Sequence, residues 1–178
     1  TGALAGFSRL TEIEAWGVAT PSGSNVALAS VSGVATASSS FGAGFPVTAL
    51  NDNERSGTGF GNGGGWNDGT PGAFPDWVQI DFNGASTIDR VVVYTLQDNY
   101  ISPQEPADGM TFSLYGVTSF TVEGWNGASW VTLGTVAGNT LVKRTLSFAA
   151  FTTDRIRVNI SGALASFSRL TEVEAWGQ

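Results

Sequence analysis

Side chains that could hold a ligand are concentrated in two long polar segments, residues 40–75 and 97–116. In the first segment, Trp66 follows three consecutive glycines, which leave it no bulky neighbour on that side. A tryptophan in this position either anchors its loop on the domain or offers its ring to a ligand. The same segment carries side chains that hold adjacent hydroxyl groups by paired hydrogen bonds, namely Arg55, Asn62, Asn67 and Asp68.

The second segment adds Asp98, Asn99 and Tyr100, which offer the same kinds of contact. Asp followed by Asn is equally typical of a turn, so both interpretations stay open. Asp98 and Glu105 also have the residue types that glycoside hydrolysis uses. Carboxylates in polar loops are usually only solvated, however, so we assign no catalytic residue.

The composition excludes several classes of site. The chain of 178 residues contains no Cys and no His, which excludes disulfides, thiolate metal sites, Cys nucleophiles and His-based catalytic triads. Its 8 Lys and Arg against 15 Asp and Glu give a net charge of −7, which argues against a nucleic-acid partner. No apolar run is long enough for membrane insertion.

Charged residues are scarce at 13% of the chain, compared with about 25% in average globular domains. Ser, Thr, Asn and Gly take their place on the surface. This composition is typical of extracellular β-proteins, and we therefore expect an extracellular or cell-surface location.

Short runs rich in Val, Ile, Thr and aromatic residues, separated by Gly, Asn, Asp and Pro, predict an all-β fold. No window shows sustained helical periodicity. Asn126 and Gly127 predict a tight hairpin turn. The two ligand-bearing segments would then be long loops on a rigid scaffold, where function is commonly found. The expected strands lie near residues 34–39, 76–82, 87–96, 117–125, 129–135, 141–148, 154–160 and 168–176.

Residues 1–17 and 161–177 are two copies of one segment. They differ only at three conservative positions: Thr1/Ser161, Gly6/Ser166 and Ile13/Val173. The offset of 160 residues is the size of a domain and not of a short repeat. We therefore divide the chain into a last-strand copy from a preceding repeat at 1–17, a linker at 18–24 and a complete domain at 25–177.

Three explanations of this repeat remain open. The chain could be part of a tandem array with a period of about 160 residues. The sequence could instead start a few residues before the domain for no functional reason. In the third explanation, the first copy fills the last-strand position of a neighbouring molecule, which is strand exchange or β-augmentation.

Six motifs in order resemble the discoidin, or coagulation factor V/VIII type C, superfamily, a galactose-binding-like group that includes the family 32 carbohydrate-binding modules. The resemblance implies a jelly-roll β-sandwich of about eight antiparallel strands with long rim loops. It also implies no catalysis, and the binding of glycans, phospholipids or protein surfaces through loops at one end. The motifs are residues 25–28 with 34–39, 49–54, 76–82, 88–94, 120–130 and 170–177.

The expected function is therefore that of a non-catalytic carbohydrate-binding module, as one unit of a tandem-repeat secreted or surface protein. The alternative is a structural module whose N-terminal segment mediates head-to-tail or filament association. Galactose-binding members of the family often use a His together with Arg and Asn, and this chain has no His. Galactose specificity is therefore not implied.

The resemblance also implies one structural Ca²⁺ ion, which takes 6–8 oxygen ligands in proteins. Its expected ligands here are Asp52, Glu54, Thr58 and Glu172. Asn53 stands where the family usually has Gly, and Asn tolerates the left-handed conformation that Gly would adopt. The alternative is a solvated acidic turn with an exposed Glu. If the first repeat copy docks into a neighbour, Glu12 would take the place of Glu172 there.

Overall fold

The computed structural model of the chain describes residues 23–177, so the predictions for residues 1–17 and for most of the linker lie outside the described residues. The prediction of an all-β sandwich of about eight antiparallel strands is confirmed. The strands are β1 (Ser24–Asn25), β2 (Val34–Ala37), β3 (Trp66–Asn67), β4 (Asp76–Thr95), β5 (Val117–Trp125), β6 (Trp130–Val136), β7 (Lys143–Ala163) and β8 (Arg169–Gly177). Three short 3₁₀ helices are η2 (Ala29–Val31), η3 (Val47–Leu50) and η4 (Leu164–Ser166).

Strands β4 and β7 are each longer than predicted, because each runs through both layers of the sandwich. The first part of β4 pairs with β2 and the last part of β7, whereas its second part pairs with β8 and the first part of β7. The pairing is interrupted between Asp81 and Ser86, where Asn83 and Gly84 are exposed. These two residues resemble a turn in the sequence, but they bend one strand from layer to layer.

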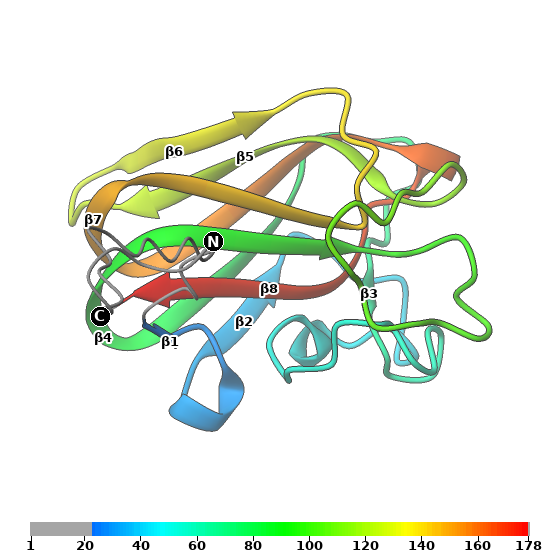
Figure 1. The fold of residues 1–178 in the computed structure, drawn as a ribbon, viewed down its shortest axis with the longest axis horizontal. Helices are drawn as coiled ribbons and strands as arrows, with labels where there is room; N and C mark the ends of the chain where they lie inside the picture. Colours follow the sequence, from blue (N-terminus) through cyan, green and yellow to red (C-terminus); the bar gives the residue numbers. More distant parts are fainter. Residues whose placement is uncertain (1–22, 178) are drawn as a thin grey trace, which may run out of the picture.

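The two layers therefore share β4 and β7. One layer has the order β2–β4–β7–β5–β6, and the other has the order β1–β8–β4–β7. Both bends lie at one end of the molecule, and the long loops gather at the other end beside β3 (Figure 1). The scaffold thus brings the segments on either side of β3, the two ends of β4 and the segment before β8 to one rim (Figure 1).

The core lies between the layers and follows the alternation of the strands. In β4, for example, Val78 and Ile80 point inward and are 1% exposed, while Gln79 between them is half-buried on the outer face. Burial of each such aliphatic side chain contributes about 1.5–3 kcal/mol. The hairpin predicted at Asn126 and Gly127 joins β5 and β6, and Gly127 has a φ of +94°.

The outer face of the five-stranded layer is covered by stacked side chains. The Arg157 guanidinium lies 5.1 Å from the centre of the Trp77 ring and 4.1 Å from that of Trp130. These two tryptophans therefore pack on the sheet, as expected for structural residues. No helix within residues 23–177 is long and apolar enough to cross a membrane.

Candidate functional site

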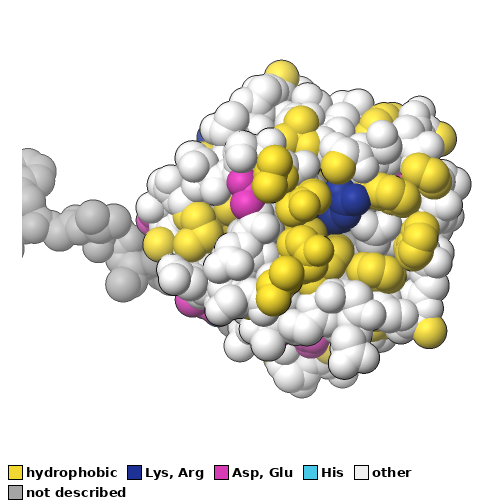
Figure 2. All heavy atoms as spheres, turned by 90° about the vertical axis from the view of Figure 1, so that its right-hand side faces the viewer, with side chains coloured by type: hydrophobic (Ala, Val, Ile, Leu, Met, Phe, Trp, Pro, Cys, Tyr) yellow, Lys and Arg dark blue, Asp and Glu magenta, His cyan; other side chains and the backbone are white. Residues whose placement is uncertain are grey.

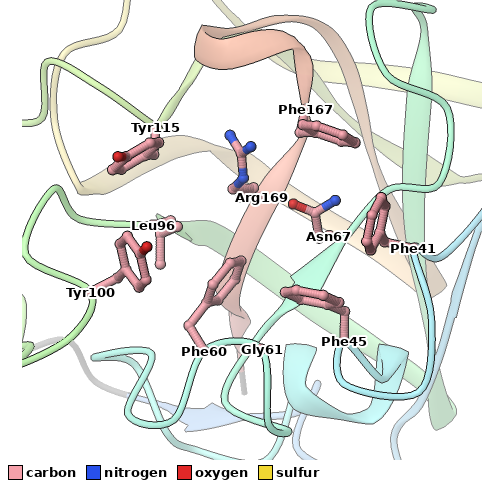
Figure 3. Close-up of a pocket in the computed structure, with 10 residues that line it drawn as sticks. All are labelled: Phe41, Phe45, Phe60, Gly61, Asn67, Leu96, Tyr100, Tyr115, Phe167 and Arg169. Atoms are coloured by element: carbon pink, nitrogen blue, oxygen red, sulfur yellow. The ribbon is translucent and has the colours of Figure 1, made fainter.

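A pocket of about 280 Å³ opens at the loop end of the sandwich. Its mouth is a hydrophobic patch with a basic side chain near its middle (Figure 2). Most of the lining is aromatic, and the side chains come from three separate parts of the chain (Figure 3). The lining residues are Phe41, Phe45, Phe60, Gly61, Asn67, Leu96, Tyr100, Tyr115, Phe167 and Arg169.

The aromatic side chains form one continuous series of edge-to-face contacts. The order is Phe167, Phe41, Phe45, Phe60, Tyr100 and Tyr115, with ring centres between 5.1 and 6.1 Å apart. Such edge-to-face pairs are favourable because the positive edge of one ring meets the negative face of the next. The series holds the walls of the pocket in place without filling it.

Arg169 closes this series into a ring. Its guanidinium lies 4.9 Å from the centre of the Phe167 ring and 5.5 Å from that of Tyr115. Burial lowers the pKa of Arg169, although the charge of Asp68 opposes this shift. Asn67 lies opposite Arg169 in the pairing of β3 with β8, so the two polar groups sit side by side in the pocket.

Two carboxylates fix the position of Ser168, the residue that precedes Arg169. The buried Asp68 carboxylate accepts hydrogen bonds from the backbone N–H of Ser168 at 2.7 Å and that of Thr70 at 2.8 Å. The Ser168 hydroxyl donates to Asp76 at 2.7 Å. Asp68 therefore positions the neighbours of Arg169 and does not itself line the pocket, contrary to the prediction of ligand contact.

Trp66 requires a correction, because it anchors its loop and offers no ring to a ligand. The side chain is 0% exposed, and its indole N–H donates to the backbone carbonyl of Ser39 at 2.9 Å. The preceding glycines do not leave the ring uncovered. They allow close packing, since a Cβ on Gly64 would lie 1.9 Å from the carbonyl oxygen of Thr58.

Two of the eight predicted ligand residues, Asn67 and Tyr100, line the pocket. Asn62 is exposed next to the lining residue Gly61 but does not line the pocket. Arg55 lies elsewhere, because it forms ion pairs with Glu105 and Glu174. For these last two residues the prediction of direct contact is not supported.

Asp98 and Asn99 have the turn role that the sequence left open. The Asp98 carboxylate accepts hydrogen bonds from the backbone N–H groups of Ser113 at 2.8 Å and Leu114 at 2.9 Å. Asn99 donates to the carbonyl of Ser102 at 2.9 Å. Asp98 thus fixes the loop that carries Tyr115, and its effect on the pocket is indirect.

The expected calcium ligands fall into two pairs. In the first pair, the negative charge of Asp52 acts on the carboxylate of Glu172. Glu172 is 0% exposed, and its Oε1 has no hydrogen-bond partner within the described residues. Burial raises the pKa of Glu172 to about 9, and the negative charges of Asp52 and Glu174 add to this shift. Burial also raises the pKa of Asp52. Asn53, which follows Asp52 in the sequence, has the expected left-handed conformation, with a φ of +76°.

Glu54 and Thr58 do not fit this role in the structure. The Glu54 carboxylate caps its own loop by accepting hydrogen bonds from the N–H groups of Gly57 at 2.8 Å and Thr58 at 3.0 Å. The Thr58 hydroxyl is hydrogen-bonded to Ser56 at 2.8 Å. Within residues 23–177, no three acidic side chains converge on a point that would hold a metal ion.

Most of the residues that line the pocket were not among the predicted ligand residues, because the predicted aromatic platform was a tryptophan. The missed side chains are Phe41, Phe45, Phe60, Leu96, Tyr115, Phe167 and Arg169. The available signal was the unusual number of phenylalanines in polar, glycine-rich segments outside the predicted strands. Aromatic residues in such segments have no core of their own to enter, so their clustering at one rim indicates a site.

The chain belongs to the F5/8 type C domain family, whose model matches residues 34–173. The resemblance to the discoidin superfamily is thereby confirmed. A comparison with curated proteins gives no match.

Solved structures with a similar fold include modules of two bacteria. Chitosan-binding module 1 of a chitosanase/glucanase from Paenibacillus sp. IK-5 has a TM-score of 0.65 at 22% identity, covering 86% of this chain and 99% of that one. Module 2 of the same enzyme, in complex with chitotriose, has a TM-score of 0.65 at 19% identity, covering 86% and 100%. The family 32 module of Clostridium perfringens NanJ, in complex with galactose, has a TM-score of 0.58 at 15% identity, covering 81% and 93%. At these identities the similarity establishes the fold.

Proposed function

We propose that this domain is a non-catalytic carbohydrate-binding module and that the aromatic pocket is its ligand site. The observation that carries the proposal is the series of six aromatic side chains that Arg169 closes into a ring, with Asn67 beside Arg169. The C–H face of a sugar is apolar and packs on aromatic rings, while its hydroxyl groups need a few fixed polar partners. Arg169 supplies donors and Asn67 supplies both a donor and an acceptor.

The size of the pocket favours a small part of a glycan. A volume of about 280 Å³ lies just below the range for ligand pockets, which begins at about 300 Å³. We therefore expect the site to hold one sugar ring, at a chain end or in a side branch. Solved modules of similar fold in complex with chitotriose and with galactose support a sugar ligand.

The proposal is tested by screening the full chain on a glycan array and measuring the hits by calorimetry. Phe41→Ala and Tyr100→Ala remove rings from opposite parts of the wall, and Phe41 is already 58% exposed. Each should weaken binding about tenfold. Ile101→Ala is the matched control, because Ile101 adjoins Tyr100, is 85% exposed and does not line the pocket. Equal affinities for all three variants would refute the pocket as the site.

A structural calcium ion remains a second part of the proposal, reduced to Asp52 and Glu172 with backbone carbonyl groups. The unpartnered Oε1 of Glu172 is the observation that supports it. The ion would supply the positive charge that this buried carboxylate lacks. Calorimetric titration of chelator-treated protein with Ca²⁺ should show binding that Glu172→Gln removes; no heat and no rise in melting temperature would reject the ion.

We also propose that the domain is one unit of a tandem repeat in an extracellular or cell-surface protein. In the described residues, the second repeat copy fills the last-strand position, where β8 pairs with β4 on one side and with β1 and β3 on the other. The first copy would find an equivalent position only in another domain. This also supports the alternative of assembly by strand exchange.

Sedimentation of the full chain distinguishes strand exchange from a tandem array. Leu170 is fully buried in β8, and Leu10 is its counterpart in the first copy. Under strand exchange, concentration-dependent oligomers form and Leu10→Asp removes them. If the chain is instead part of a tandem array without strand exchange, it sediments as a monomer at all concentrations with or without the substitution.

A further inference from the structure

The lining of the pocket carries one positively charged side chain and no negatively charged one. Arg169 is the single ionisable acid or base other than tyrosine among the pocket's lining residues. Arg55 and Arg155, by contrast, form ion pairs with nearby carboxylates. Arg169 forms no ion pair within residues 23–177.

The acidic group that acts most strongly on Arg169 is Asp68, and it is already engaged. Its carboxylate is buried and accepts hydrogen bonds from Ser168 and Thr70. The Asp68 charge therefore acts on Arg169 only from a distance, and its carboxylate forms no ion pair with the guanidinium. Among the lining residues, Arg169 therefore contributes the one full charge.

The guanidinium is held in place while most of its donors are free. It has five N–H donors, and one hydrogen bond is present within the described residues, from Nη1 to the carbonyl of Leu164 at 3.3 Å. The rings of Phe167 and Tyr115 fix its position. An orientation fixed in advance lowers the entropic cost of binding a planar anion.

Resting on the proposed carbohydrate function, we infer that this pocket selects a sugar that carries a carboxylate, such as a uronic acid, and rejects a cationic amino sugar. The sugar carboxylate would form paired, charge-assisted hydrogen bonds with Arg169, which are about twice as strong as neutral ones. The apolar face of the sugar would pack on the aromatic wall. An ammonium group would face Arg169 without a compensating carboxylate in the lining.

The ligand class is tested with monosaccharides, because the net charge of −7 repels long polyanions. Calorimetry or NMR titration of the full chain would compare D-galacturonic acid with its methyl ester, D-galactose and D-glucosamine. At about pH 6 the uronate is ionised and the amine is protonated. The acid should bind at least about tenfold more tightly than the ester, which differs from it in charge and not in ring structure.

Arg169→Gln should remove the difference between acid and ester, while Arg155→Gln on the outer face should leave it unchanged. The comparison of acid with ester in the unchanged protein does not depend on how a variant folds. Equal binding of acid and ester, or tighter binding of glucosamine, would overturn the charge inference and leave the carbohydrate function standing. If no sugar of any charge binds, the proposed function itself fails.

Discussion

The backbone N–H of Ser168 donates a 2.7 Å hydrogen bond to the carboxylate of Asp68, although 100 residues separate them in the sequence. Both residues are 0% exposed. The bond ties the end of β3 to the start of β8 and so sets the position of Phe167 and Arg169 in the pocket. The site is therefore built on a buried polar contact and not on loop residues alone.

Asp68→Asn should destabilise the domain by about 1–3 kcal/mol, because the amide nitrogen of Asn cannot accept the hydrogen bond that Thr70 donates. Sugar affinity should fall as well, since Phe167 and Arg169 would shift. Urea unfolding and calorimetry measure the two effects. Asp89→Asn, at an exposed position of β4, is the control and should change neither.

Trp66→Ala should destabilise the domain by about 3–5 kcal/mol, because a fully buried ring and two hydrogen bonds are lost. Trp66→Phe keeps most of the volume and should cost clearly less. Denaturant unfolding provides both values. If Trp66→Ala abolished sugar binding in a domain of unchanged stability, Trp66 would be a ligand residue after all.

Ser166→Gly should stabilise the domain by up to about 1 kcal/mol, because Ser166 has a φ of +61°, which glycine adopts without strain. The first repeat copy has Gly6 at the equivalent position. Ser161→Gly lies within β7 and should have the opposite sign, since glycine weakens a strand. Thermal unfolding of both variants compares them; a less stable Ser166→Gly variant would contradict the argument.

The pH dependence of stability should show the buried Glu172. Its pKa rises from 4.5 to about 9 on folding, so the folded state holds a proton that the unfolded state loses between these values. The contribution of Glu172 is therefore complete below pH 4.5 and is lost as the pH rises toward 9, by at most about 1.4 kcal/mol per pH unit.

Glu172→Gln isolates this effect when both proteins are unfolded in the presence of a chelator. The stability of the variant relative to the original chain should therefore increase as the pH rises from about 4.5 toward 9. With excess Ca²⁺ the difference should reverse, because the ion requires the ionised carboxylate. A difference that does not depend on pH in chelator would show that Glu172 is not held neutral.

Much of the fold could be predicted because local patterns and global structure agree. The alternation of Val78, Gln79 and Ile80 identifies a strand with one buried face. Asn126 with Gly127 identifies the hairpin turn between β5 and β6. Asn53 has the left-handed conformation expected from its replacement of glycine. The bends of β4 and β7 were not predictable, since Asn83 and Gly84 look the same in a bend as in a turn.

The site could be predicted only in part, because contacts between distant segments create it. Asn67 and Tyr100 were found from their residue types, whereas Arg169 lies in the repeated segment that the sequence marks as a strand. Its place in the pocket follows from the pairing of Asn67 with Arg169 across β3 and β8. No local pattern reveals that pairing.

The most direct test of the aromatic pocket as the ligand site is an NMR titration of the isotope-labelled chain with the sugar that binds best. If the aromatic pocket binds the sugar, chemical-shift changes cluster on Asn67, Tyr100, Tyr115 and Arg169, including the Arg169 side-chain N–H signal. Changes centred instead on Trp77, Trp130 and Arg157 of the outer sheet face would place the ligand elsewhere and contradict the aromatic pocket as the site.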